Sequence, residues 1–467
     1  MATTVTQERL TGRAWAVLLV LCGAIFLEGI DVSMMGVALP SIRAELGLST
    51  TELQWVVSAY LLSYGGFVLL GGRAADLLGR RRMFIGWLVV FLLFSGLGGF
   101  ANEGWVLIVA RFVTGIAAAF MTPAGLSIIT TTYPEGPQRN KALLVYAGTA
   151  GAGFSLGMVT GGLLTAIDWR WVFFAPVVLA AIILVGALAL IPREANPALT
   201  RTGFDLTGAL TLTGAMLLLV ATVVRAPDVQ AGQTLATVVG GLALFGLFLL
   251  VERRAAAPLV RFGVFRSASL VRANLGAILL VGSFVGFQFV TVLYLQELRH
   301  WSEFETGLAL MVLGLDAILS PLLTPWLVER FGNGRVMFGG FVFAAAGYAL
   351  FLPLGADWTY AAMLPTFLLL SLAFSFAYGP LTIAATDGVA EEEQGLAGGV
   401  LTTSFQFGSA LGLAVVAAML ATADELTLDG FRTALLVPLV AAVLGLAATA
   451  PGLKKRATSA APAGNPG

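Results

Sequence analysis

The sequence predicts an all-α membrane protein with fourteen transmembrane helices. Of its 467 residues, 58% are hydrophobic and only 11% are charged, whereas an ordinary soluble domain carries roughly 25% charged residues. A chain this apolar cannot cover the surface of a soluble globule, and it is too hydrophobic to be disordered. It also contains many stretches of the roughly 20 apolar residues that a membrane-spanning helix needs.

Fourteen such stretches follow one another, and short connections separate them. The connection 192–205 is polar and the connection 252–272 is basic, so neither continues a helix through the membrane. The predicted helices cover residues 14–40, 52–72, 83–101, 105–131, 141–166, 171–191, 206–224, 233–251, 273–295, 306–328, 336–355, 359–383, 396–420 and 432–450.

The orientation follows from the Lys and Arg residues of the connections, because positive charges gather on the cytoplasmic side. With the N-terminus inside, the inside segments hold 20 basic residues and the outside segments hold 5. The remaining basic residue, Arg111, lies within a predicted helix. We therefore expect both termini in the cytoplasm and the protein in the cell (inner) membrane.

The composition argues against several classes of function. The 26 basic and 26 acidic residues balance, whereas a nucleic-acid partner calls for a basic patch. None of the three lysines completes a glycine-rich loop that could cradle ATP phosphates. With only Cys22 and His300, a clustered metal site is not expected, and no nucleophile–base pair stands out. We expect no metal, no cofactor and no enzymatic activity.

Four ionisable residues lie inside predicted helices: Glu28 and Asp31 in the first, Arg111 in the fourth and Asp316 in the tenth. Such residues are costly in a bilayer and usually functional. Asp31 and Arg111 lie about 13 and 9 Å from the outer ends of their helices, so the two can form an ion pair. That pair could serve proton coupling, or it could only fix the register of two helices.

Glu28 and Asp316 have no second buried cation as a partner. Glu28 lies three residues from Asp31 and shares its helix face. An unpaired buried carboxylate avoids the cost of its charge by binding a proton, and it can exchange that proton as water access alternates between the two sides. Three acids would also suit cationic cargo. The sequence therefore predicts Asp31, Arg111, Glu28 and Asp316 as proton-coupling residues.

Aromatic and amide side chains within the helices could form the rest of a substrate pocket. Each of them could equally serve helix packing. The candidates are Tyr60 and Tyr64 in the second helix, Gln288 and Tyr294 in the ninth, and Gln406 in the thirteenth.

Five segments carry motifs that resemble those of the major facilitator superfamily, within it the fourteen-helix branch of drug:proton antiporters. The resemblance covers nearly the whole chain. The segments are residues 30–40 (IDVSMMGVALP), 54–62 (QWVVSAYLL), 72–82 (GRAADLLGRRR), 111–115 (RFVTG) and 394–399 (QGLAGG).

The chain departs from the pattern of that branch at three positions. The antiporter motif of the fifth helix usually reads G-P-x-x-G-G, and here Met158 stands in place of its proline. Thr114 replaces a common glutamine in the fourth helix. Glu28 is an additional acid outside the pattern of the first helix.

The resemblance implies a major facilitator fold, in which two six-helix bundles rock around a site at the membrane midplane. The N-terminal bundle would comprise residues 1–192 and the C-terminal bundle residues 261–455. Residues 193–260 would form a linker and the two inserted helices 7 and 8. Residues 456–467 would form a disordered cytoplasmic tail.

The resemblance also implies residues that take part in conformational change. The loop between the second and third helices supplies one set, and the glycines of the fifth helix supply the other because they let two helices approach closely. The first set is Gly72, Asp76, Gly79 and Arg80, and the second is Gly157, Gly161 and Gly162.

The function that the resemblance implies is proton-coupled efflux of amphipathic, cationic or neutral small molecules by alternating access, as in multidrug efflux and antibiotic resistance. The partners would be the substrate, protons and the lipid bilayer, without nucleic acid, and the proton gradient would replace a cofactor. The protein is expected to be a monomer. A dedicated metabolite or antibiotic exporter and a proton symporter stay open as alternatives. A membrane enzyme or receptor would need a catalytic cluster or a soluble domain, and neither is visible.

Overall fold

The structure is a computed structural model, and the part of the chain that it describes is all-helical. The predicted tail at 456–467 and most of the predicted linker, residues 193–204, lie outside the described residues. The described residues are 12–133, 137–192, 205–226, 229–255, 258–389, 393–421 and 427–454.

Fourteen helical segments of the described chain are long and apolar enough to cross a membrane, which confirms the predicted number of spans and the fold class. Each of the first eight spans is a single helix. They are formed by α1 (Gly12–Leu46), α2 (Thr50–Leu78), α3 (Arg80–Gly99), α4 (Gly104–Thr132), α5 (Pro137–Thr165), α6 (Trp171–Leu190), α7 (Leu206–Arg225) and α8 (Ala231–Arg254).

Several of the last six spans are composed of shorter pieces. The ninth, tenth and fourteenth change helix type or direction within the span. The elements are α9 (Ala268–Leu293) with η2 (Tyr294–Leu298), α10 (Glu303–Leu310) with η3 (Met311–Leu315) and α11 (Asp316–Phe331), α12 (Asn333–Phe351), α13 (Tyr360–Thr386), α14 (Gln394–Ala421), and α15 (Leu428–Ala434) with α16 (Leu436–Thr449).

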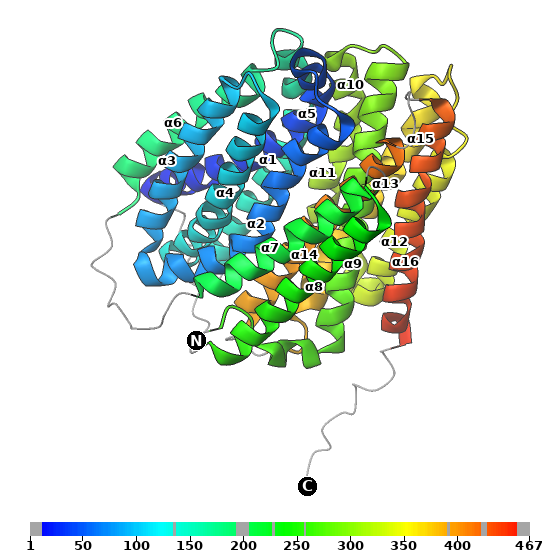
Figure 1. The fold of residues 1–467 in the computed structure, drawn as a ribbon. Coiled ribbons are helices and arrows are strands. Elements are labelled where there is room, and N and C mark those ends of the chain that lie inside the picture. Colours follow the sequence, from blue (N-terminus) through cyan, green and yellow to red (C-terminus); the bar gives the residue numbers. More distant parts are fainter. Residues whose placement is uncertain are drawn as a thin grey trace.

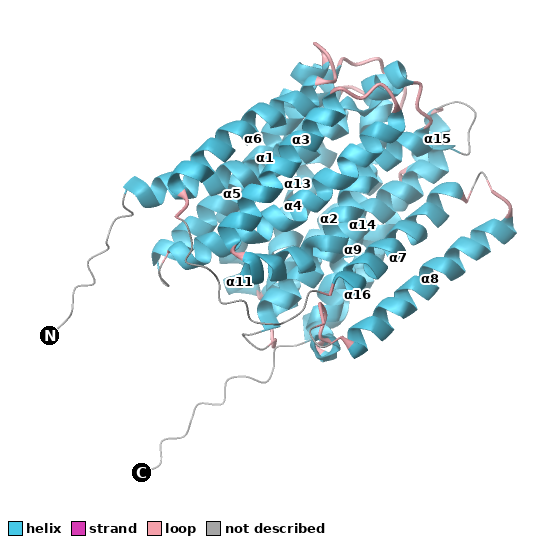
Figure 2. Cartoon of the chain, turned by 60° about the vertical axis from the view of Figure 1, so that its left-hand side comes forward, coloured by secondary structure: helices cyan, strands magenta, loops and turns pink. Residues whose placement is uncertain are grey.

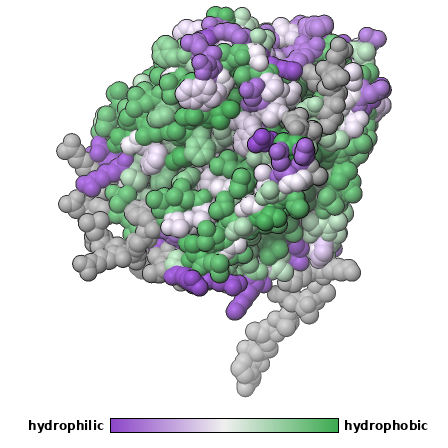
Figure 3. All heavy atoms as spheres, viewed as in Figure 1, coloured by the Kyte–Doolittle hydropathy of each residue, from purple (hydrophilic) through white to green (hydrophobic). Residues whose placement is uncertain are grey.

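The surface of the molecule matches a bilayer. Figure 3 shows apolar residues across the middle of the face in view and hydrophilic residues gathered mainly toward its two ends. Large apolar side chains are exposed on the outer helices, for example Val185 on α6 and Leu235 on α8. Lipid tails can cover these side chains, whereas water would leave an apolar area of this size unfavourably exposed.

The two halves of the chain share local features. The second and tenth spans both begin with a Ser-x-x-Glu capping box, at Ser49 and at Ser302. A glycine with positive φ separates the second span from the third and the tenth from the eleventh: Gly79 at +96° and Gly332 at +86°. These recurring features support the predicted division into two six-helix bundles around an inserted pair, and its boundaries stay a prediction.

Two polar contacts join the two halves at the end of the bundle where α1 ends, which we call the far end. It lies opposite the end at which the N- and C-termini emerge (Figure 1). Here Arg43 Nη1 lies 3.1 Å from Glu297 Oε2, and Ser41 donates a hydrogen bond of 2.8 Å to Glu303. Both contacts join α1 to elements of the second half, so they hold the far end closed.

The inserted helices lie to one side of the two halves. Helix α7 packs against α2 of the first half and α14 of the second. Helix α8 packs on α7, lies at the edge of the molecule in Figure 2, and is the least buried of the spans. The pair is therefore peripheral, as the resemblance implies, but α7 touches both halves.

The prediction that the first helix ends near Pro40 is wrong, because α1 continues to Leu46. Proline removes one hydrogen bond from a helix, and neighbouring groups can satisfy the carbonyls near it. Near this proline, Gln296 donates a 3.0 Å hydrogen bond to the Val37 carbonyl. Leu39 and Ile42, which lie on either side of Pro40, are both buried and pack this part of the helix against its neighbours.

The tenth span is interrupted within the membrane. The sequence analysis predicts one continuous helix over 306–328, so this interruption was not predicted. Helix α10 passes into the 3-10 turn η3, and α11 then begins at Asp316. Ser155 of α5 donates a 2.9 Å hydrogen bond to the Gly314 carbonyl within this turn. The break therefore places Asp316 at the first turn of a new helix inside the span.

Candidate functional site

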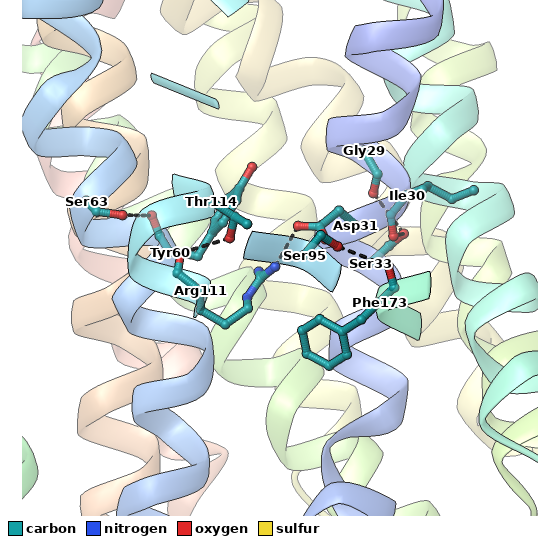
Figure 4. Close-up of polar contacts among 10 residues, drawn as sticks. All are labelled: Gly29, Ile30, Asp31, Ser33, Tyr60, Ser63, Ser95, Arg111, Thr114 and Phe173. Atoms are coloured by element: carbon teal, nitrogen blue, oxygen red, sulfur yellow. Dashed lines mark hydrogen bonds and ion pairs between the residues drawn. The ribbon is translucent and has the colours of Figure 1, made fainter. Parts of the chain in front are cut away.

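The predicted ion pair between the first and fourth helices is present. Arg111 Nη1 of α4 lies 2.6 Å from Asp31 Oδ2 of α1, and both side chains are only 2% exposed. Figure 4 shows the two side chains pointing toward each other across the gap between the helices. This is a dry, charge-assisted contact inside a membrane span, where electrostatic interactions are strong.

Close helix packing brings these residues together. One turn beyond Arg111 on the same face of α4, a Cβ added to Gly115 would lie 2.9 Å from Tyr60 Cα of α2, so only glycine lets the two backbones approach this closely. Thr114, which replaces the usual glutamine, donates a 3.0 Å hydrogen bond to the Arg111 carbonyl. The threonine therefore bonds its own helix and leaves the guanidinium to Asp31.

Glu28 occupies a separate polar position one turn from Asp31. Its Oε2 accepts a 2.5 Å hydrogen bond from the Thr122 hydroxyl of α4, and Tyr64 of α2 also interacts with its carboxyl group. Within the described chain Glu28 forms no ion pair. Thr122 was not among the predicted residues, because a threonine within an apolar helix more often bonds its own backbone.

Asp316 lies at the N-terminus of α11, where the helix dipole favours a negative charge. Over the described ranges it forms no ion pair. Tyr378 of α13 lies within electrostatic reach of both Asp316 and Glu28, and its ring stacks on Phe405 with centroids 4.6 Å apart. Tyr378 was not predicted. Its side chain is 43% exposed.

The predicted pocket residues do not gather in one place. Tyr60 is fully buried and Tyr64 is 4% exposed, so their rings lie inside the first half rather than on an open surface. Tyr294 is also fully buried and donates a 2.7 Å hydrogen bond to the Gly355 carbonyl. In this conformation, Tyr60 and Tyr294 therefore have no surface that a substrate could contact.

The two predicted amides lie at helix interfaces. Gln288 is 8% exposed and its Nε2 lies 3.5 Å from Met158 Sδ. Gln406 of α14 faces α2, and a Cβ added to Gly65 would lie 2.8 Å from its Cβ. Gln406 keeps part of its side chain accessible, so it is better placed than Gln288 to meet a ligand.

The glycines of α5 pack in two directions. A Cβ at Gly157 would lie 2.9 Å from Ile30 Cα, and one at Gly161 would lie 2.7 Å from Met34 Cα, both on α1. A Cβ at Gly162 would lie 3.0 Å from Phe304 Cα of α10. The motif therefore ties α5 to α1 within one half and to α10 of the other half at the far end.

The loop between α2 and α3 turns at Gly79, whose φ of +96° favours glycine. Gly72 lies on α2 with Pro123 of α4 as its neighbour, 3.8 Å from a Cβ placed there. Arg80 begins α3. The predicted role of Asp76 falls on a side chain outside the described part of the structure.

A pocket of about 620 Å³ opens at the far end. It surrounds the ion pair of Arg43 and Glu297, and Trp301 and Glu303 also line it. The pocket therefore lies at the closed contact between the halves, away from the Asp31–Arg111 pair. Among the described residues, no group of three or more His, Cys, Asp or Glu could hold a metal ion.

Comparison with known proteins agrees with this architecture. Residues 21–413 match the sequence model of the Major Facilitator Superfamily. The chain is 37% identical to the puromycin resistance protein pur8 of Streptomyces alboniger, over 86% of this chain and 81% of that protein. It is 34% identical to the cephamycin export protein CmcT of Amycolatopsis lactamdurans, over 87% of this chain and 85% of that protein.

The fold resembles that of solved transporters as well. A POT family transporter in complex with 5-aminolevulinic acid superimposes with a TM-score of 0.69 at 16% identity, and the match covers 94% of this chain and 96% of that one. At this identity the likeness concerns the fold alone. With its fourteen spans, its family match and these relatives, the chain belongs to the Major Facilitator Superfamily, whose members here are membrane transporters of small molecules rather than enzymes.

Proposed function

We propose that the protein is a proton-coupled exporter of amphipathic, cationic or neutral small molecules that works by alternating access. The observation that carries this proposal is the dry Asp31–Arg111 pair inside the membrane. A structural role alone does not call for it, because a well-packed apolar pair is often as stable as a buried ion pair. Relatives named for antibiotic resistance and export support the direction of transport.

The proposed coupling step is a competition for Asp31. When its carboxylate binds a proton, the attraction to Arg111 is lost and the guanidinium must find other partners, which favours another arrangement of α1 and α4. Glu28 and Asp316 would bind protons or the charge of a cationic substrate. Tyr64 and Gln406 would contact the substrate, and we assign no such contact to Tyr60, Gln288 or Tyr294 in this conformation.

The proton gradient can supply enough energy for this step. One charge crossing 100 mV gains about 2.3 kcal/mol, and one pH unit adds about 1.4 kcal/mol per proton. For a neutral substrate, one proton can therefore drive a gradient of more than about a hundredfold. The proposal places both termini in the cytoplasm, treats the protein as a monomer, and needs no cofactor.

Reconstituted vesicles test this function. We expect vesicles that contain the protein to move ethidium or puromycin when a pH gradient is imposed, and a protonophore to stop that movement. Asp31→Asn should abolish gradient-driven transport because its side chain cannot bind and release a proton. Undiminished gradient-driven transport by Asp31→Asn would overturn the assignment of Asp31, and transport that ignores the protonophore would overturn proton coupling.

A narrower function, export of one antibiotic or metabolite, is favoured by relatives that are named for single compounds. A proton symporter would share the same acids and stays the other alternative. Thermal shift of the purified protein against a panel of antibiotics and cationic dyes separates narrow from broad specificity. Stabilisation by a single compound class supports a dedicated exporter, whereas stabilisation by many unrelated cations supports broad efflux.

A further inference from the structure

The guanidinium of Arg111 has a second neighbour besides Asp31. Its central carbon lies 4.3 Å from the centroid of the Tyr60 ring, which is the geometry of a cation–π contact. The only hydrogen bond described for its side chain is the one from Nη1 to Asp31, and Nε has no partner among the described residues. The aromatic face is therefore a main contact of this buried cation.

The position of the Tyr60 ring is set by the backbone rather than by its hydroxyl group. The Tyr60 hydroxyl is buried without a partner in the described structure, whereas its carbonyl accepts a 3.1 Å hydrogen bond from Ser63. The close approach at Gly115 fixes α2 against α4 one turn beyond Arg111. The backbone contacts of α2 with α4 therefore place the ring against the guanidinium, and no hydrogen bond of the hydroxyl is needed.

Tyr60 also lies near both acids of α1. Its ring meets the Tyr64 ring edge to face, with centroids 6.1 Å apart, and Tyr64 interacts with Glu28. Tyr60 lies within electrostatic reach of Glu28, Asp31 and Arg111. The other titratable groups that face this cluster are Tyr146 of α5 and Tyr378 of α13, both toward Glu28.

We infer that Tyr60 is a positioning residue for proton coupling: its ring holds Arg111 on Asp31 and thereby sets the pH range in which Asp31 exchanges its proton. This inference rests on the proposed function. A cation held close to a carboxylate favours the ionised form. If the ring is removed, Arg111 is held less firmly on Asp31, so the pH dependence of coupled transport should change. Tyr60 thus acts through Arg111 rather than by touching a substrate.

The test compares variants that keep or remove the ring. Tyr60→Leu and Tyr60→Met remove it, and Tyr60→Phe keeps it without the hydroxyl. We expect the pH midpoint of gradient-driven transport to shift by about one unit in Tyr60→Leu and Tyr60→Met, and to stay at the wild-type value in Tyr60→Phe. Tyr348→Leu is the matched control, because Tyr348 is equally buried but lies in α12.

An infrared titration of the purified protein separates this inference from the proposed function. The protonated carboxyl band that Asp31→Asn removes should titrate at a different pH in Tyr60→Leu than in wild type, whether or not transport is detected. A titrating band without any proton-coupled transport would overturn the proposed function, and with it the coupling role of Tyr60. Coupled transport with the same midpoint in Tyr60→Leu and wild type would overturn the inference alone.

Two further results would also count against the inference. If Tyr60→Phe shifts the midpoint as far as Tyr60→Leu, the hydroxyl rather than the ring is responsible. If neither Tyr60→Leu nor Tyr60→Met folds while Tyr348→Leu does, the ring serves folding rather than coupling.

Discussion

The two members of the buried ion pair differ in how they respond to losing a partner. Arginine cannot be deprotonated in a protein, so Asp31→Asn leaves a permanent charge in a dry site. Asp31 can instead bind a proton when Arg111 is absent. Because both side chains are 2% exposed, water cannot screen the remaining charge. Substitution of Asp31 should therefore destabilise the protein more than substitution of Arg111.

We predict that Asp31→Asn lowers the free energy of unfolding by about 3–5 kcal/mol and that Arg111→Gln lowers it by clearly less. Thermal unfolding midpoints in detergent near neutral pH measure the difference. Ser95→Ala is the control, because it removes a single buried hydrogen bond, to the Phe173 carbonyl. Equal losses in the two variants, or a larger loss in Arg111→Gln, would contradict the prediction.

The individual residues show what sequence can and cannot predict. The ion pair could be predicted, because helical rise fixes the depth of Asp31 and Arg111 in the membrane. The sequence does not reveal which face of a helix looks inward when nearly every side chain is apolar. Tyr60 was therefore grouped with pocket residues although it is fully buried, and Tyr378 was missed although it lies within electrostatic reach of both Glu28 and Asp316.

At the scale of the elements, the far end is closed by contacts between α1 and the segment that leads into α10. The Arg43–Glu297 pair is about one quarter exposed on each side, so its stabilising effect is small. It nevertheless joins the two halves, and its loss therefore changes the balance between conformations rather than the stability of either half.

We predict that Arg43→Glu opens the far end more often, because like charges then face each other. A cysteine at position 158, introduced in a Cys22→Ala background, should react about two- to tenfold faster with a membrane-impermeant maleimide. Met158 is fully buried in the closed form. The charge swap Arg43→Glu with Glu297→Arg should restore the slow rate, and an unchanged rate in Arg43→Glu would argue against a latch at this position.

Hydrophobic length predicted the existence of the helices well, because each span must satisfy its own backbone in the bilayer. It failed where tertiary contacts override local signals. The turn at Met311–Leu315 depends on Ser155 of another helix, and the continuation of α1 past Pro40 is accompanied by packing and by a hydrogen bond from Gln296. Neither partner is visible from the local sequence.

At the scale of the whole molecule, the excess of basic residues on one side predicts that both termini are cytoplasmic. We expect a cysteine at Asp429, which is 88% exposed at the far end, to react with an impermeant maleimide in intact cells. A cysteine at Glu329, exposed at the opposite end, should react only after permeabilisation. The reverse pattern would invert the topology and would turn the proposed exporter into an importer.

Helix α7 has a consequence for how cargo can arrive. In a bundle of two rocking halves, the interface between the halves faces the lipid along two seams, one on each side. Amphipathic molecules dissolved in the lipid could enter laterally through such a seam. Across one seam, α7 packs on both α2 and α14, with Met216 Cε 3.3 Å from a Cβ placed at Gly65. On that side, α7 separates the seam from the lipid. Lipid-borne molecules are left with the opposite seam, where Gly151 of α5 meets Ala317 of α11.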